Sequence, residues 1–293
     1  MEKQTKRLFI YILLGVLVIA AAACGAREPE ATPTPTLEPT PTEAPMAARV
    51  NGEGILLTEY EAEMQRYQAG MQAAGETSDD ATASQAVLEE LENQTLLAAA
   101  AQQQGYSVDD AALQTRLDEL TQEAGGSEQL QSWLGANFYT EESFKIALKR
   151  DMQATWMKQQ IIVEVGTTAE QVHARQILLY SQEDADAVLA QLQAGTSFED
   201  LAYEYDELTG GELGWFPRGY LLQSAVEDAA FSLEAGSYSD VISTSYGYQI
   251  IEVIEKDAQH ELSPDALLFV QRKALNAWLD QQRAQGSIET LVP

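Results

Sequence analysis

Two short segments of the chain share a pattern that is typical of buried β-strands. ARQILLY at residues 174–180 and GYQIIEV at residues 247–253 each place a glutamine directly before an isoleucine and further aliphatic residues. Both lie in a region, from about 168 to 256, where strand-like stretches alternate with helix-like stretches. This alternation predicts a small α+β sandwich. A buried glutamine amide needs hydrogen-bond partners, so the roles of Gln176 and Gln249 need an explanation.

The sequence on either side of this region has helical periodicity. After a short turn-bearing strand near VNGEGILL, apolar residues recur at helical spacing up to about Val165, and we expect five helices, among them helices that begin at Ser84, Ser107 and Thr140. A last helix is expected from Ser263-Pro264, ending at Gly286. Because a lone amphipathic helix must bury its apolar stripe, we expect this last helix to pack on the amino-terminal helices.

The apolar stripes of these helices predict mutual packing surfaces rather than a cofactor site. They contain neither histidine nor cysteine, so we expect no metal ion, haem or other cofactor. The chain has 46 acidic and 17 basic residues and a net charge of −29. Such a charge argues against nucleic acid, and against an anionic membrane surface, as a direct partner.

The amino terminus has the order of a secretory signal. Lys3, Lys6 and Arg7 precede an apolar stretch that ends in small residues next to the single cysteine, Cys24. This arrangement resembles the lipobox of bacterial lipoproteins, which implies a signal peptide over 1–23 and lipidation of Cys24. An ordinary cleavage site or a plain membrane anchor are the alternatives. The protein is thus expected to be extracytoplasmic and tethered to the bacterial cell membrane.

A spacer follows the cysteine. Residues 24–47 are rich in threonine and proline, which predicts an extended, semi-rigid tether. A proline-rich ligand for another domain is the alternative, although the basic flanks of such ligands are missing.

Five blocks in the second half of the chain occur in the order of a known domain. They are VHARQILL (172–179), FEDLA (198–202), GGELGWFPRG (210–219), EDAAFSLEAGSYSDVIST (227–244) and YGYQIIEV (246–253). Together they resemble a parvulin-type (PpiC) peptidyl-prolyl cis-trans isomerase domain. With the lipobox and the helical half, the whole chain is similar to extracytoplasmic foldases of the PrsA and SurA type.

The resemblance implies an α+β protein of two domains. The first is a helical, SurA-like chaperone domain at residues 48–166, to which the carboxy-terminal segment 258–293 returns. The second is a small parvulin-like α/β sandwich with a mainly antiparallel sheet at residues 167–257. The partners implied are unfolded or proline-containing secreted polypeptides.

The resemblance also implies where the site lies. Members of this family supply two facing histidines on adjacent central strands, a nearby Cys or Asp, a Thr or Ser, and an apolar pocket. The histidine positions fall on Gln176 and Gln249, and Thr244 keeps its place. The Cys-or-Asp position falls in a short loop, at Asp206 or else at one of its two successors, Glu207 and Leu208. The implied substrate-binding residues are Leu213, Phe216, Val226 at the phenylalanine position, and Leu221 or Leu222 at the methionine position.

The two glutamines bear directly on activity. Twisting a prolyl bond breaks no covalent bond, so the reaction needs an apolar slot, exclusion of water and hydrogen bonds to the twisted amide. If the imidazoles contribute about 1–3 kcal/mol, their loss slows the reaction by about five- to 150-fold. We therefore expect an isomerase whose activity is weakened or lost while the fold and the binding groove are kept. One alternative is that the two amides bond each other and merely join two strands.

A non-catalytic holdase is the alternative function. It would bind unfolded segments on the helical domain and on an aromatic-lined groove near Trp215, Phe216 and Tyr220. His173 lies an odd number of residues from Gln176, so it should face the other side of the sheet. Both His173 and His260 are expected to be solvated surface residues.

Overall fold

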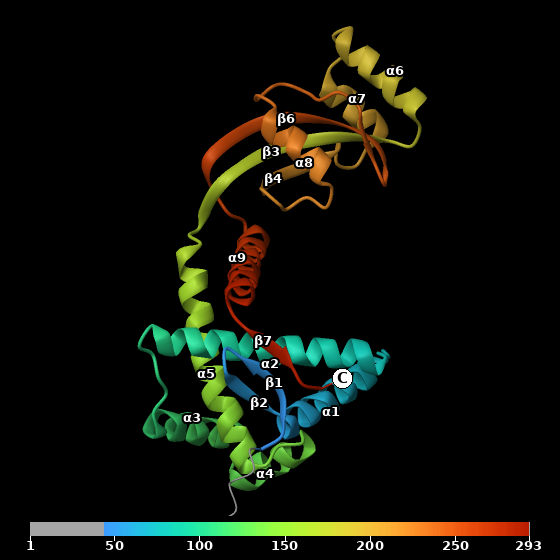
Figure 1. The fold of residues 1–293 in the computed structure, drawn as a ribbon. Coiled ribbons are helices and arrows are strands. Elements are labelled where there is room, and N and C mark those ends of the chain that lie inside the picture. The colour runs from blue at the N-terminus through green and yellow to red at the C-terminus, as the bar shows by residue number, and fades with distance from the viewer. Residues whose placement is uncertain (1–43, 293) are drawn as a thin grey trace, which may run out of the picture. The chain divides into compact units, whose positions relative to one another are not determined.

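The computed structural model describes residues 44–292 (Figure 1). The expected signal peptide, Cys24 and the tether up to residue 43 lie outside the described residues. Helices and two antiparallel sheets make up the described chain, so the predicted α+β class is confirmed. Between residues 44 and 292, no helix combines the length and the apolarity that a membrane crossing requires.

The amino-terminal part consists of a hairpin and five helices. The hairpin pairs β1 (Met46–Val50) with β2 (Glu53–Leu56). Its turn residues, Asn51 and Gly52, have φ values of 53° and 86°, as a type I′ turn requires. The helices are α1 (Leu57–Ala74), α2 (Asp80–Gln103), α3 (Asp110–Glu123), α4 (Ser127–Ala136) and α5 (Glu141–Glu164).

Side-chain caps explain where α5 and the last helix, α9 (Pro264–Gln285), begin. Thr140 and Ser143 form a capping box, in which each backbone N–H donates to the other residue's hydroxyl at 3.0 Å. Ser263 accepts a hydrogen bond from the N–H of Ala266 at 3.3 Å, and Pro264 occupies the first helical position. Both predicted starts are confirmed.

Two other predicted helix starts are wrong. Asp79 caps α2 by accepting from the N–H of Thr82 at 2.9 Å, so α2 begins before Ser84. Asp109 caps α3 in the same way, so α3 begins after Ser107. In both places an aspartate near the predicted serine takes the capping role, for which the two residue types are about equally suited.

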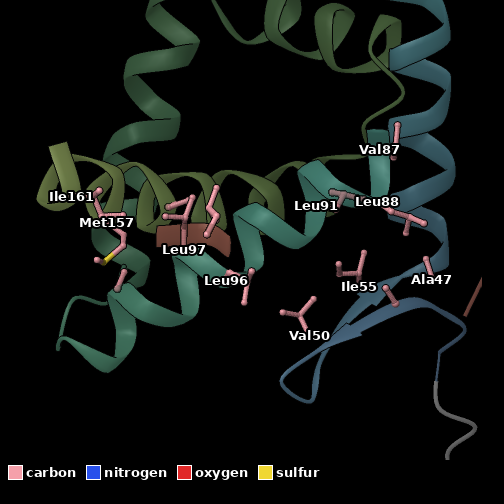
Figure 2. Packing of buried hydrophobic residues seen from close by; sticks show 14 residues of the cluster. Ala47, Val50, Ile55, Val87, Leu88, Leu91, Leu96, Leu97, Met157 and Ile161 are labelled. Carbon is pink, nitrogen blue, oxygen red and sulfur yellow. The ribbon is translucent and has the colours of Figure 1, made fainter. Parts of the chain in front are cut away.

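One hydrophobic cluster joins the hairpin, α2, α5 and the carboxy-terminal segment (Figure 2). Leu279 of α9 lies in this cluster, and the short strand β7 (Ile288–Thr290) pairs with β1. Segments from both ends of the described chain thus contribute to the same core. Its other large buried members are Val50, Ile55, Val87, Leu88, Leu91, Leu96, Leu97, Met157 and Ile161.

The second part of the described chain contains a four-stranded antiparallel sheet in the order β4-β3-β6-β5. Its strands are β3 (Thr168–Leu179), β4 (Glu212–Pro217), β5 (Ile242–Thr244) and β6 (Gly247–Glu261). Three helices accompany the sheet, namely α6 (Gln182–Gln193), α7 (Phe198–Tyr205) and α8 (Ser224–Ser232) (Figure 1).

The register of β3 and β6 assigns the helices to opposite faces of the sheet. Facing residues of an antiparallel pair share a face, and successive residues alternate. Ile177 and Ile250 face each other and belong to the cluster that contains residues of α6 and α7. The neighbouring Ile251, together with Val253, belongs to the cluster that contains residues of α8.

Candidate functional site

The face of the sheet that packs on α8 carries the polar residues singled out in the sequence. Gln176 of β3 faces Ile251 of β6, and Gln249 of β6 faces Leu178 of β3. The two glutamines therefore share this face and are diagonal neighbours on adjacent strands. In β5, Ile242 is the partner of Gln249. Thr244 lies two residues after Ile242, so it lies on the same face.

Gln249 is held by two hydrogen bonds. Its Nε2 donates to Oε1 of Gln223 and, at 3.3 Å, to Oγ1 of Thr244. The residue is only 3% exposed. Its Oε1 is buried and has no hydrogen-bond partner among the described residues. An unpaired buried acceptor costs about 1–3 kcal/mol, so Gln249 is not a fully satisfied core amide.

Gln176 is bound through its main chain rather than its amide. Its N–H donates to the carbonyl of Gly211 at 2.8 Å. A side chain at position 211 would collide with the carbonyl oxygen of Gln176, because a Cβ there would lie 1.8 Å from it. In the described part of the chain, no hydrogen bond joins the Gln176 side chain to Gln249. The alternative that the two amides bond each other is therefore wrong, because Gln223 takes that place.

Asp206 shapes the loop that reaches Gln176. Its carboxylate accepts from the N–H groups of Leu208 and Thr209 at 3.2 and 3.1 Å, and from the Thr209 hydroxyl. These bonds, the hydroxyl bond first, hold the pKa of Asp206 below its usual range. The carboxylate thus closes the turn that leads to Gly211. Leu208 is 94% exposed.

The expected pocket residues divide into buried and accessible ones. Phe216 and Val226 are 0% and 1% exposed, inside the cluster that contains residues of α8. Leu213 and Leu221 are partly buried and pack against that cluster, whereas Leu222 is 93% exposed. Of the two candidates for the methionine position, Leu221 is therefore the one whose side chain packs beside the buried residues.

The expectation of an aromatic-lined groove is wrong. Phe216 is completely buried, and its neighbour Trp215 points to the other face of the sheet. There Trp215 stacks on the rings of His173 and His260, with centroid distances of 5.3 and 3.9 Å. The two histidines are therefore not the freely solvated residues that we expected.

His173 has a further side-chain partner, Glu212. Its Nε2 lies 2.6 Å from Oε1 of Glu212. Because His173 lies on the opposite face of β3 from Gln176, it does not replace the imidazole expected at position 176.

Sequence reasoning missed two residues at the start of α8. Gln223, which directly precedes the helix, provides the acceptor for Gln249. Glu227, in the first turn, is 8% exposed and accepts from the N–H groups of Gly219 and Leu221 at 2.6 and 3.1 Å. The signal that the sequence offers for Glu227 is an acidic residue in the first turn of a helix. No local pattern indicates Gln223.

The fold and this polar network define a class of protein: a helical domain combined with a small α+β domain of the parvulin type. Residues 1–158 match the family model of the SurA-like N-terminal domain, and residues 144–257 match that of the PPIC-type PPIase domain. The first match covers more than half of the 293 residues. The chain belongs to the SurA-like N-terminal domain family, and the resemblance stated from its motifs is confirmed.

Proteins called foldase protein PrsA are similar to this chain over part of their length. Foldase protein PrsA of Oceanobacillus iheyensis is 32% identical over 179 residues, which are 58% of this chain and 58% of that protein. The PrsA of Bacillus subtilis is 31% identical over 168 residues, 53% of this chain and 56% of that protein. The chain thus spans a little over half the length of these relatives.

Solved structures are similar at lower levels. PrsA from Bacillus cereus is 20% identical with a TM-score of 0.44, covering 83% of this chain and 88% of its own. NmPin, the parvulin of Nitrosopumilus maritimus, is 32% identical with a TM-score of 0.27, covering 30% of this chain and 98% of its own.

Proposed function

We propose that the protein is an extracytoplasmic folding factor whose parvulin-type domain isomerises peptidyl-prolyl bonds in secreted polypeptides, with weakened catalysis. The observation that carries this proposal is that Gln176, Gln249 and Thr244 share one face of the sheet. The match of residues 144–257 to the PPIC-type PPIase domain and the relatives named foldase also support it.

The chemistry of the amides supports the weakening. Rotation about a peptide bond has a barrier of about 18–20 kcal/mol. An isomerase lowers this barrier for a prolyl bond with preorganised hydrogen bonds to the twisted amide. Both N–H bonds of the Gln249 amide are directed at Gln223 and Thr244. Neither is free for a client. Gln176 has an unengaged amide, but a glutamine lacks the protonated form that an imidazole can adopt.

A refolding assay tests the proposed activity. A denatured protein whose refolding is limited by a prolyl bond is allowed to fold with increasing amounts of the purified protein. Faster folding at substoichiometric amounts supports an isomerase, because a catalyst turns over. Suppressed aggregation only near equimolar amounts, without faster folding, contradicts it.

The membrane tether is part of the same proposal. We infer that Cys24 carries the lipid that holds the protein outside the cytoplasmic membrane, from the small residues that precede it and the basic start of the chain. Lipidation of Cys24 is measured by growing cells that express the protein with labelled palmitate and detecting the label on the protein. Replacement of Cys24 by Ala is expected to abolish the label, and a labelled Cys24→Ala variant would contradict the inference.

A second function, that of a holdase, is favoured by an exposed apolar region of the helical domain. Phe138 and Ile146 are 44% and 49% exposed. They line a hollow of about 320 Å³ with Leu56, Ala62, Tyr139 and Ala147. Accessible apolar surface of this kind suits the side chains of unfolded segments.

Variants distinguish this second function. Replacing Phe138 and Ile146 by Ser should reduce the suppression of client aggregation at equimolar amounts. Val163, which is 73% exposed on the same helix as Ile146, provides the control Val163→Ser. If the unaltered protein, the Phe138 and Ile146 variant and Val163→Ser suppress aggregation equally, the hollow does not bind unfolded segments.

A further inference from the structure

Glu227 is a buried carboxylate that has no basic partner within residues 44–292. It lies in the first turn of α8 and is 8% exposed. Its Oε1 accepts from the N–H of Gly219 at 2.6 Å, and its Oε2 accepts from the N–H of Leu221 at 3.1 Å. Within residues 44–292 it forms no salt bridge. The polar partners of the Glu227 carboxyl group are therefore two main-chain donors beside the amino terminus of α8.

These bonds fix the loop between β4 and α8. Gly219 and Leu221 flank Tyr220, so the two oxygens of one carboxylate hold the backbone on both sides of it. Gly219 has a φ of 86°, a value that suits glycine. Loop connections are ordinarily the more mobile parts of a fold. Here the first turn of α8 holds the loop.

The loop carries Leu221, one of the partly buried apolar side chains of the candidate site. Leu221 packs against the cluster that contains Phe216 and Val226, while Leu222 next to it points outward. A change in the backbone at 221 would move this side chain. The same end of α8 also supplies Gln223, the acceptor for Gln249. The start of α8 therefore touches both the apolar and the polar side of the site.

The chemistry at this position requires a carboxylate. Two N–H groups point at two oxygens of one side chain, and a glutamine offers one acceptor oxygen and one donor nitrogen. In Glu227→Gln, one N–H would therefore face another donor, although the side chain keeps its size. Aspartate keeps both acceptors on a shorter stem.

We propose that Glu227 is a positioning residue of the isomerase site, which holds Leu221 where it contacts the proline ring of a client. The inference rests on the proposed isomerase function. Glu227 itself does not touch the client. Its effect is expected on client binding, because the apolar contact to the ring exists before and during the twist.

The test compares Glu227→Gln with Asp228→Asn. Asp228 is the exposed neighbour of Glu227 in the same helical turn, so its replacement removes the same charge without touching the loop. A Leu-Pro-containing tetrapeptide is titrated into the full-length isotope-labelled protein, and its Kd is measured by NMR well below the unfolding temperature. The amide signals of Gly219 and Leu221 report the loop directly.

We expect Glu227→Gln to bind the peptide at least fivefold more weakly and to shift both amide signals, while Asp228→Asn matches the unaltered protein. Glu227→Asp should recover part of the affinity, and it takes the place of Glu227→Gln if that variant fails to fold. Equal peptide affinity in the Glu227 variants and Asp228→Asn would overturn the positioning role alone. If the unaltered protein binds no proline peptide, the proposed isomerase function fails, and the role of Glu227 fails with it.

Discussion

Gln249 of β6 donates a hydrogen bond from its side-chain amide to the side-chain carbonyl of Gln223, the residue before α8. The second acceptor, Thr244, defines which way the Gln249 amide points. The Thr244 hydroxyl donates its single hydrogen to the carbonyl of Gly247 at 2.8 Å, so towards Gln249 it can only accept. Nε2 of Gln249 must therefore face Thr244, and Oε1 is left without a partner.

The bond between Gln249 and Gln223 predicts an energetic coupling. In a double-mutant cycle of Gln223→Ala and Gln249→Ala, we expect a coupling of about 0.5–1.5 kcal/mol in the free energy of unfolding. Urea denaturation measures it. Gln176→Ala combined with Gln223→Ala is the control and should be additive, because the Gln176 amide has no hydrogen bond within the described chain. A coupled control pair and an additive Gln223–Gln249 pair would reverse this account.

The turn closed by Asp206 predicts a pH effect. Its hydrogen bonds favour the charged carboxylate, so the pKa of Asp206 in the folded protein lies below the unfolded value, near 3.8. Its contribution to stability is fully present above the unfolded pKa and is lost as the pH falls through the folded pKa. Thr209→Val removes the hydroxyl and should raise the folded pKa, as an NMR titration of the carboxyl carbon measures.

A matched threonine provides the control for the Asp206 titration. The Thr115 hydroxyl bonds the carbonyl of Ala111 within α3, so Thr115→Val should leave the Asp206 titration unchanged. If Thr209→Val and Thr115→Val titrate alike, the Thr209 hydroxyl does not stabilise the carboxylate.

The closed core around Val226 predicts that the family's phenylalanine does not fit at this position. Val226 is 1% exposed, and extra volume in a packed core costs about 1–3 kcal/mol. We expect Val226→Phe to lower the free energy of unfolding by that amount in urea denaturation. Leu222→Phe, at a side chain that is 93% exposed, should change it by less than about 0.5 kcal/mol. If Val226→Phe leaves the free energy of unfolding unchanged, the core around Val226 can accommodate the larger side chain.

The placement of Leu279 predicts that α9 stabilises the helical core. Leu279 is 6% exposed and packs with residues of α2 and α5. Leu279→Ala should therefore cost about 2–5 kcal/mol in the unfolding transition of the helical domain, followed by the fluorescence of its tryptophans. Leu268→Ala, at a side chain of the same helix that is 62% exposed, is the control. If Leu279→Ala and Leu268→Ala have the same unfolding transition, α9 does not stabilise the helical domain.

The sequence was informative where the determining contacts are local. Thr140 and Ser263 cap their helices through residues three positions along the chain, which is a pattern that can be read directly. The β3 and β6 strands follow from their aliphatic runs, and the odd offset between His173 and Gln176 places them on opposite faces. That Gln176 and Gln249 share a face depends in addition on the register between β3 and β6, which alternation within one strand does not fix.

The parts that could not be predicted depend on contacts between distant residues. Gln223 binds Gln249, which lies 26 residues further along the chain, and the sequence around Gln223 contains no pattern that predicts this contact. The stacking of His260 on Trp215 depends on the long β6 strand, whose length the aliphatic run alone underestimates. Polar residues continue β6 because β3 provides its hydrogen-bond partners. Strand length is thus set by the sheet rather than by local propensity.

The most direct test of the weakened site restores its imidazoles. The kcat/KM for a proline-containing peptide is measured for the unaltered protein and for the double variant Gln176→His/Gln249→His, with Gln193→His, an exposed position of α6, as the control. We predict that the double variant is faster by about five- to 150-fold and that the control is unchanged. A double variant that folds, binds the peptide and is no faster would contradict the claim that the two glutamines limit catalysis.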